Sequence, residues 1–183
     1  MILIFNELMK NSNSKSICLI PARGGSKRIK NKNIRKFFGK PLLSRVIKIL
    51  RKSNIFDDIF VSTDSIKIKK IAEKSGAVVP YLRSKKLSGD NAIIKDVIDD
   101  FINKEVKKNR KTTNLFIVYP TSIFINKKIL LNCLRLLNKT EYVTLLKKFP
   151  HPIQRALEYK NKKLSPINLK QKLMRTQDLK EYF

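Results

Sequence analysis

In Leu19-Ile-Pro-Ala-Arg-Gly-Gly-Ser-Lys-Arg-Ile-Lys-Asn-Lys-Asn33, an apolar strand runs through a proline into a small, strongly cationic loop. The adjacent glycines in this loop allow backbone N–H groups to turn toward a ligand. Basic side chains crowd positive charge around the same place, at Arg23, Lys27, Arg28, Lys30 and Lys32. Because anions are held best by backbone donors acting together with full positive charges, the loop predicts a polyphosphate site.

The length and composition fit one folded α/β domain. The chain has 183 residues, of which 42% are hydrophobic, and no apolar run approaches the roughly 20 residues that cross a bilayer. The apolar start, Met1-Ile-Leu-Ile-Phe5, is too short for the apolar region of a signal peptide. We therefore expect an N-terminal extension over 1–15, either frayed or packing locally, then a single domain over 16–183, with a cytoplasmic location and no membrane partner.

The strong positive charge allows two interpretations. Lys and Arg number 41 against 14 Asp and Glu, for a net charge of +27. Such a balance would suit a basic nucleic-acid-binding protein, which stays an alternative. However, most of these residues are lysines scattered along the chain, with no basic tail, so we favour a general lysine bias. The two cysteines, Cys18 and Cys133, have no metal-ligand spacing, and we expect buried, reduced thiols.

Strand and helix patterns alternate along the chain. This alternation predicts a mostly parallel sheet covered by helices, with ligands bound at the carboxyl ends of the strands. We expect Asp64 to cap the helix that stops before Gly76. The predicted strands are 16–20, 57–62, 77–81, 115–119 and 142–146, and the predicted helices are 42–50, 65–75, 93–102 and 129–137.

Four polar loops follow predicted strands and should converge on one edge of the sheet. They are the cationic loop that contains Gly24 and Gly25, which we call the glycine loop, together with Ser62-Thr-Asp64, Tyr81-Leu-Arg83 and Tyr119-Pro-Thr121. The spacing of the five glycines, Gly24, Gly25, Gly39, Gly76 and Gly89, matches neither G-x-G-x-x-G nor G-x-x-x-x-G-K-[ST]. The phosphate loop is therefore neither a dinucleotide-binding fingerprint nor the P-loop of nucleotide hydrolases.

The segment from Ile20 to Asn33 resembles the signature of sugar-acid cytidylyltransferases, the family of CMP-nonulosonic acid synthetases (acylneuraminate cytidylyltransferases). Phe38-Gly-Lys-Pro-Leu42, Val61-Ser-Thr-Asp64, Leu82-Arg83 and Tyr119-Pro-Thr121 follow in the family's order. Phe149-Pro-His-Pro-Ile-Gln-Arg-Ala156 and Arg175-Thr-Gln-Asp-Leu179 are similar to the pseudaminic acid branch, as is Tyr119, where the sialic acid branch usually has Gln. The resemblance extends from about Ser16 to Phe183.

The resemblance implies a nucleotide-diphospho-sugar transferase fold, with a Rossmann-like, mostly parallel sheet sandwiched by helices. It also implies transfer of CMP from CTP to the anomeric hydroxyl of pseudaminic acid or a related nonulosonic acid, with release of pyrophosphate. The expected partners are CTP, an acidic nine-carbon sugar and a second copy of the chain, with Mg²⁺ as cofactor and no nucleic acid.

Site residues follow from the same resemblance. It makes Arg23 and Lys27 catalytic, as the residues that grip the triphosphate. It assigns nucleotide binding to Ala22, Gly24, Gly25, Ser26, Lys32, Asn33 and Arg83, and sugar-acid binding to Tyr119, Thr121, Gln154 and Arg155. Plainer roles stay open for Lys30 and Lys32 as solvated charge, for Tyr119 as an aromatic at the core edge, and for His151 as a structural turn residue.

The chain departs from the family pattern in two places. Ala92 and Ile94 stand where family members usually have small hydroxyl residues that can face the nucleotide. Family members also continue into a segment with the acidic residues that hold Mg²⁺, whereas no Asp-x-Asp pair occurs here. We therefore expect a C-terminally truncated domain and name no metal ligand. A truncated, inactive nucleotide-binding remnant is the alternative function.

Overall fold

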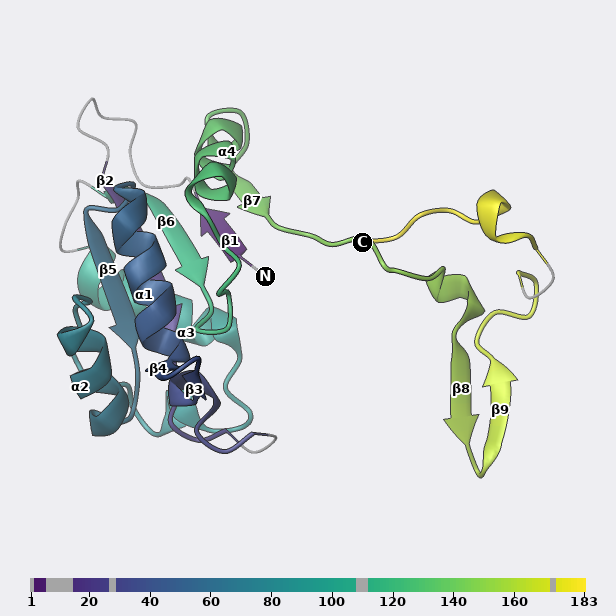
Figure 1. The fold of residues 1–183 in the computed structure, drawn as a ribbon, viewed down its shortest axis with the longest axis horizontal. Helices are drawn as coiled ribbons and strands as arrows, with labels where there is room; N and C mark the ends of the chain where they lie inside the picture. The colour runs from purple at the N-terminus through teal and green to yellow at the C-terminus, as the bar shows by residue number, and fades with distance from the viewer. Residues whose placement is uncertain (1, 6–14, 27–28, 108–111, 172–173) are drawn as a thin grey trace. The chain divides into compact units, whose positions relative to one another are not determined.

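The computed structural model describes residues 2–5, 15–26, 29–107, 112–171 and 174–183. The chain divides into two compact units, Met1–Thr144, which we call the sheet unit, and Leu145–Phe183, which we call the C-terminal unit (Figure 1). The predicted boundaries, an extension over 1–15 and one domain over 16–183, stay predictions.

A five-stranded sheet forms the centre of the sheet unit. Its strands lie in the order β5 (Asp58–Ser62), β2 (Lys15–Pro21), β6 (Thr112–Val118), β1 (Ile2–Phe5) and β7 (Tyr142–Thr144). Strand β2 pairs in parallel with both neighbours, whereas β1 is antiparallel to β6 and to β7. Strand β7 therefore runs in the common direction, and the predicted mostly parallel sheet is confirmed.

The apolar N-terminal segment is a strand of this sheet. The Cα of Ile2 lies opposite Val118 of β6, and the Cα of Leu3 lies opposite Thr144 of β7. The sequence allowed a frayed end or a local packing segment, and the structure places four residues between two strands from the other end of the unit. The apolar composition was visible in the sequence, but these long-range partners were not.

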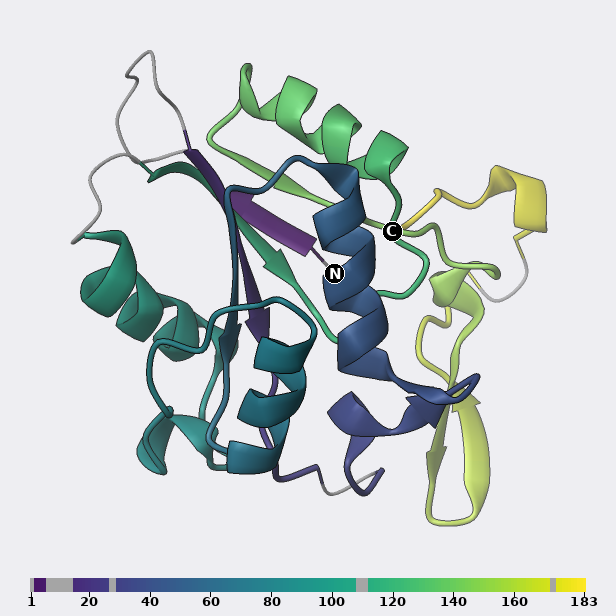
Figure 2. The same cartoon turned by 60° about the vertical axis from the view of Figure 1, so that its left-hand side comes forward.

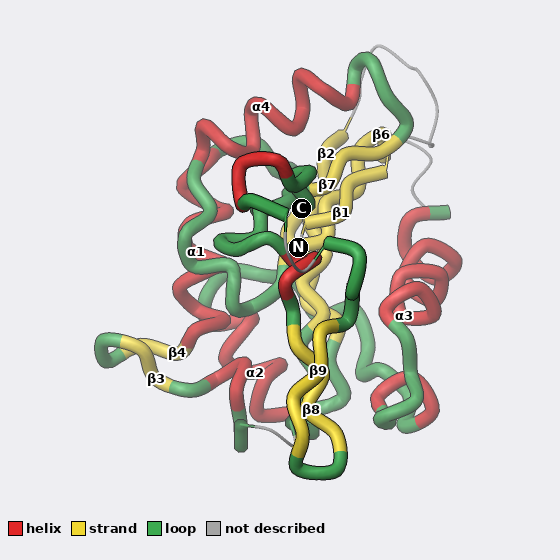
Figure 3. Tube along the Cα trace, turned by 90° about the vertical axis from the view of Figure 1, so that its right-hand side faces the viewer, coloured by secondary structure: helices red, strands yellow, loops and turns green. Residues whose placement is uncertain are grey.

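Helices cover both faces of the sheet. They are α1 (Leu42–Ser53), α2 (Ile66–Lys74), α3 (Ile94–Phe101), which continues into a π-helical turn (Ile102–Val106), and α4 (Lys127–Leu137). Figures 2 and 3 show α1 lying across the strands and α3 on the opposite side of the sheet. All four predicted helices are present, and the sandwich of helices around the sheet is confirmed.

One predicted helix cap is wrong. Helix α2 is capped by Ser65, whose hydroxyl accepts a hydrogen bond from the Ile68 N–H at 3.4 Å. Asp64 stands one residue too early to cap the helix, and its carboxylate is engaged elsewhere. The predicted stop at Gly76 is correct, because this glycine has a φ of +89° that a side chain would strain.

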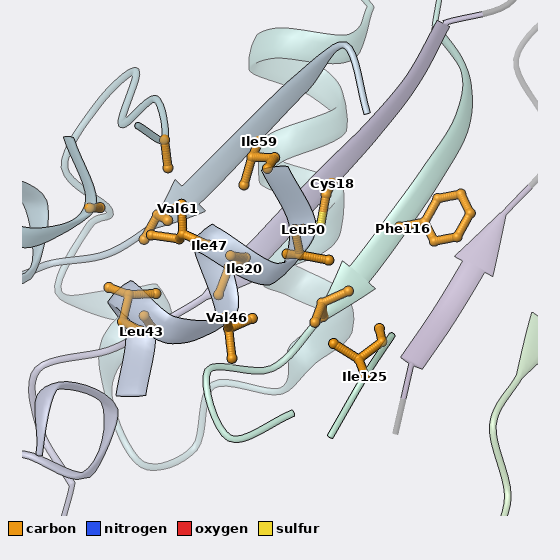
Figure 4. Close-up of a cluster of buried hydrophobic side chains, with 14 of the residues drawn as sticks. Cys18, Ile20, Leu43, Val46, Ile47, Leu50, Ile59, Val61, Phe116 and Ile125 are labelled. Carbon is orange, nitrogen blue, oxygen red and sulfur yellow. The ribbon is translucent and has the colours of Figure 1, made fainter. Parts of the chain in front are cut away.

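Two apolar clusters lie on the two faces of the sheet because successive strand residues point to opposite sides. Cys18 and Ile20 of β2 pack against α1, where Leu43, Val46, Ile47 and Leu50 form an i, i+3, i+4, i+7 stripe (Figure 4). The alternate residues of β2, Ile17 and Leu19, pack with Phe101 of α3. Cys18 and Cys133 are buried and free, as expected.

The predicted strand over 77–81 is only partly formed. Val78 makes an isolated parallel bridge with Phe60, and Leu82 makes one with Thr63. A small hairpin that the sequence did not predict joins β3 (Lys36–Phe37) to β4 (Lys40–Pro41). Its turn residues Phe38 and Gly39 have φ values of +47° and +75°, as a two-residue type I′ turn requires.

The C-terminal unit contains a hairpin of β8 (Leu157–Lys160) and β9 (Lys163–Pro166), with short 3₁₀ turns at Ile153–Arg155 and Thr176–Asp178. Among its described residues only Gln154 and Leu179 are buried. Over the described parts of both units, no helix has the length and apolarity needed to cross a membrane.

Candidate active site

A pocket of about 260 Å³ opens at the carboxyl ends of β2 and β6 and beside Arg83, which follows the partly formed strand at 77–81. It lies wholly within the sheet unit, and three of the four loops predicted to converge there contribute to its lining, whereas Ser62-Thr-Asp64 after β5 does not. Six of the predicted site residues contribute to its lining, along with an apolar wall from the start of α3. These six are Arg23, Lys32, Asn33, Arg83, Tyr119 and Thr121.

The glycine loop begins on a fixed base. Ala22 is completely buried in the core, and its N–H donates to the Ser62 carbonyl at 2.9 Å. Its methyl group therefore packs against the protein interior, although Ala22 was predicted to bind nucleotide. Gly24, Gly25 and Ser26 follow beside the pocket lining, and Lys27, predicted to be catalytic, lies outside the described residues.

Arg23 is held at both its backbone and its guanidinium group. The Asn33 side-chain amide donates to the Arg23 carbonyl at 2.9 Å. The Arg23 Nη1 donates to the Gly89 carbonyl at 2.8 Å, and Nη2 lies 3.3 Å from the Asp90 carboxylate. Asn33 is buried, so this amide supports the Arg23 backbone in addition to lining the pocket.

Arg83 presents a nearly buried positive charge to the pocket. The residue is only 6% exposed, its N–H donates to the Thr63 carbonyl at 2.8 Å, and its Nε donates to the Ser88 hydroxyl at 3.1 Å. Burial lowers the pKa of Arg83, and the Asp64 carboxylate opposes that shift. A desolvated guanidinium binds anions and carbonyl oxygens more strongly than one in water.

A polar network fixes the segment before Arg83. The Tyr81 hydroxyl donates to Asp100 Oδ2 at 2.9 Å, and Lys104 Nζ lies 2.7 Å from Asp100 Oδ1 and 4.5 Å from the centre of the Tyr81 ring. Burial and the Asp100 hydrogen bond raise the pKa of Tyr81. Sequence reasoning missed this network, and the only signal was the i, i+4 spacing of Asp100 and Lys104.

The rest of the pocket lining is less polar. Tyr119 is half-buried at its edge, and burial raises the pKa of its phenol, which keeps the hydroxyl protonated. Ala92 and Ile94 line the opposite wall, so the departure from small hydroxyl residues falls inside the pocket. Ala92 and Ile94 therefore offer a ligand no side-chain hydrogen-bond partner.

Two predicted sugar residues lie in the C-terminal unit and are placed only within it. The Gln154 Nε2 donates to the Lys180 carbonyl at 2.8 Å, while its buried Oε1 has no partner among the described residues. Arg155 is exposed, and its guanidinium donates to the Met174 carbonyl. His151 lines a pocket of about 250 Å³ within this unit, together with Phe149.

The family model for cytidylyltransferases matches residues 17–182, and these residues include all the described residues of the pocket. The chain belongs to the cytidylyltransferase family. Strand β1 lies outside the matched region.

Two bacterial relatives are similar to this chain over more than half of its length. A pseudaminic acid cytidylyltransferase from Campylobacter jejuni subsp. jejuni serotype O:2 is 37% identical over 168 residues, which cover 90% of this chain and 72% of that enzyme. A CMP-N,N'-diacetyllegionaminic acid synthase from Legionella pneumophila subsp. pneumophila is 37% identical over 108 residues, 59% of this chain and 47% of the relative.

A solved structure gives the same fold. A CMP:2-keto-3-deoxy-manno-octonic acid synthetase complexed with CTP superposes with a TM-score of 0.58 at 18% identity. The match covers 69% of this chain but only 48% of that one. At such low identity the likeness establishes the cytidylyltransferase fold alone.

The described acidic residues near the pocket bear on the predicted Mg²⁺. No group of three or more His, Cys, Asp or Glu side chains that could hold a metal ion occurs among the residues that the structure describes. Two acidic residues contact the glycine loop and both are engaged, Asp64 by the Gly24 N–H and Asp90 by Arg23. No chemical step is therefore assigned to a metal ion, and Mg²⁺ stays a prediction.

Proposed function

We propose that this chain transfers CMP from CTP to the anomeric hydroxyl of pseudaminic acid or a closely related nonulosonic acid. The observation that carries the proposal is the pair Arg23 and Arg83, which line one pocket within the part of the chain that matches the family. The identity to the Campylobacter relative, over most of both chains, supports the choice of sugar.

In the proposed reaction, the anomeric oxygen attacks the α-phosphorus of CTP and forms a new P–O bond. The bond from the α-phosphorus to the oxygen that bridges to the β-phosphate breaks, pyrophosphate leaves, and the hydroxyl proton is released. Negative charge builds up on the equatorial oxygens and on the leaving group in the transition state. Fixed cations stabilise that charge without having to reorganise during the reaction.

The candidate residues have separate roles in this reaction. Arg23 and Lys27 bind the triphosphate, and Arg83 binds the cytosine or the ribose from its buried position. Lys32 and Asn33 contact the nucleotide, and Tyr119 and Thr121 bind the sugar acid. For Gln154 and Arg155 of the C-terminal unit, sugar binding rests on the family resemblance alone. Mg²⁺ is expected from the family resemblance, and no step of this proposal is assigned to it.

Pyrophosphate release tests the proposed reaction. The chain should release pyrophosphate only when CTP and the sugar acid are both present, and Arg23→Ala should abolish the release. Replacing CTP by UTP, or pseudaminic acid by sialic acid, provides the specificity controls. Tight CTP binding without any pyrophosphate release would instead identify an inactive nucleotide-binding remnant.

We also propose that the chain forms a homodimer through its C-terminal unit. A lone two-stranded hairpin is marginally stable, and within the β8–β9 hairpin Leu157, Tyr159 and Leu164 are all more than half exposed. A second copy would cover these apolar side chains. Sedimentation velocity should show a dimer that Tyr159→Lys dissociates, and a monomeric wild-type protein would contradict the proposal.

A further inference from the structure

Asp64 connects the glycine loop to the start of α2. Because Ser65 caps the helix, the Asp64 carboxylate is available for another partner, and it accepts the Gly24 N–H at 2.7 Å. This short hydrogen bond joins residues that are 40 positions apart in the sequence. The Gly24 N–H is therefore committed to the protein and cannot serve a phosphate.

The contact between the loop and α2 is close as well as polar. A Cβ on Gly24 would lie 3.0 Å from the Cβ of Ser65 and 3.7 Å from the Asp64 carboxylate, whereas a Cβ on Gly25 would meet nothing within 4 Å. Gly24 thus allows the loop to sit directly on the first turn of α2. The two adjacent glycines therefore differ: Gly24 allows the close approach to Ser65, and its N–H is already bonded to Asp64.

Asp64 also acts on the second arginine of the pocket. Arg23 and Arg83 line the same pocket, and the positive charge of Arg23 contributes to lowering the pKa of Arg83. The negative charge of the Asp64 carboxylate acts in the opposite sense and raises the pKa of Arg83. One carboxylate therefore accepts a hydrogen bond from the loop that carries Arg23 and also acts electrostatically on the buried guanidinium of Arg83.

We propose that Asp64 is a positioning residue that fixes the two cationic walls of the pocket, by holding the Gly24 peptide and by balancing the charge of Arg83. The inference rests on the proposed nucleotide site and deepens it. Asp64 acts through its neighbours, so its loss should weaken CTP binding without removing any phosphate-binding side chain.

Two substitutions separate the two effects. Asp64→Ala removes both the hydrogen-bond acceptor and the charge, whereas Asp64→Asn keeps an oxygen that can accept the Gly24 N–H and loses only the charge. The chain offers a matched control in Asp57, whose carboxylate accepts the Ser16 N–H at 2.9 Å just before β5 begins. Asp57→Ala removes the same type of bond at the other end of this strand, away from the pocket lining.

CTP affinity by calorimetry and Gly24 amide exchange by NMR form the test. Asp64→Ala should raise the Kd for CTP about tenfold or more and accelerate Gly24 exchange. Asp64→Asn should restore slow exchange and raise the Kd only about threefold. Asp57→Ala should leave the Kd within about twofold of wild type, although its carboxylate bond is equally lost.

The inference is overturned if Asp64→Ala binds CTP as wild type does, or if Asp57→Ala weakens binding equally. Failure of the proposed function gives a different pattern, in which the wild-type protein itself binds no CTP. In that case Gly24 exchange decides the loop-holding role alone: faster exchange in Asp64→Ala supports it, and unchanged exchange overturns it.

Discussion

The sheet unit and the C-terminal unit hold their candidate site residues in different ways. In the sheet unit, apolar clusters on both faces of the sheet fix the strand ends, and the pocket loops are tied to those ends by hydrogen bonds. In the C-terminal unit, Gln154 and Leu179 are the only buried residues among those described. The pocket of the sheet unit is therefore built on a rigid base, whereas the residues of the C-terminal unit predicted to bind the sugar depend on a few polar contacts.

Core substitutions should reveal this contrast between the units as a difference in stability. Phe116→Ala removes a completely buried ring that meets Phe56 at 5.0 Å, and should cost about 3–5 kcal/mol of unfolding free energy. Leu179→Ala should cost about 2 kcal/mol or less, because few buried neighbours surround this residue. Urea unfolding measures both values, and equal losses would contradict the contrast.

We expect the start of the glycine loop to be as tightly packed as the strand ends of the sheet unit. Gly24→Ala places a Cβ 3.0 Å from Ser65, and should cost about 1–3 kcal/mol because the loop or α2 must shift. Gly25→Ala meets nothing within 4 Å and should change stability by less than about 0.5 kcal/mol. Thermal unfolding of the two variants tests the prediction, and a neutral Gly24→Ala would show that the loop is loosely seated.

The Tyr81–Asp100 network before Arg83 predicts that the unfolding free energy depends on pH. Tyr81→Phe should cost about 1–2 kcal/mol at neutral pH, since the phenol donates to a carboxylate. Folding raises the pKa of Tyr81, so its stabilisation is present at neutral pH and is lost above about pH 10, where the unfolded tyrosine ionises.

Unfolding free energies from neutral to alkaline pH test this sign. The alkaline loss of stability should be smaller in Tyr81→Phe than in wild type. Tyr142→Phe is the control, because Tyr142 is 65% exposed. If both variants decline as wild type does, the Tyr81 hydroxyl does not support the Arg83 segment.

We expect the smallest effect from the most exposed ion pair of the pocket lining. The ion pair between Arg23 and Asp90 is partly exposed, with side chains 36% and 50% accessible. Asp90→Asn should therefore leave stability nearly unchanged, but it removes a negative charge that competes with the phosphates of CTP. We expect CTP affinity to rise by up to about fivefold, measured by calorimetry at low salt. Weaker binding would instead make Asp90 a support for Arg23.

The periodicity of apolar residues was sufficient to predict most helices and strands of the sheet unit. The stripe along α1 and the buried strands β2, β5 and β6 were predictable because each has a local pattern of apolar residues. The convergence of Arg23, Arg83 and Tyr119 followed from the rule that parallel strands end at one edge. The short sequence signature from Ile20 to Asn33 supplied the family.

What the sequence could not provide were contacts between distant residues. The pairing of β1 with β6 and β7, the bond from Gly24 to Asp64, and the Tyr81–Asp100 network each depend on tertiary geometry. Asp64 shows the reason clearly. Its residue type and position before a helix favoured a capping role, but the neighbouring Ser65 fills that role and leaves the carboxylate for the loop.

CTP binding to Arg23→Ala, measured by calorimetry beside the wild-type protein, decides whether this pocket is a nucleotide site. Arg23 lines the pocket of the sheet unit and is the first cation of the family signature. We predict that wild type binds CTP and that Arg23→Ala, with an unchanged unfolding midpoint, binds it at least about a hundredfold more weakly. Unchanged CTP affinity in a folded Arg23→Ala protein would contradict the assignment of this pocket to the nucleotide.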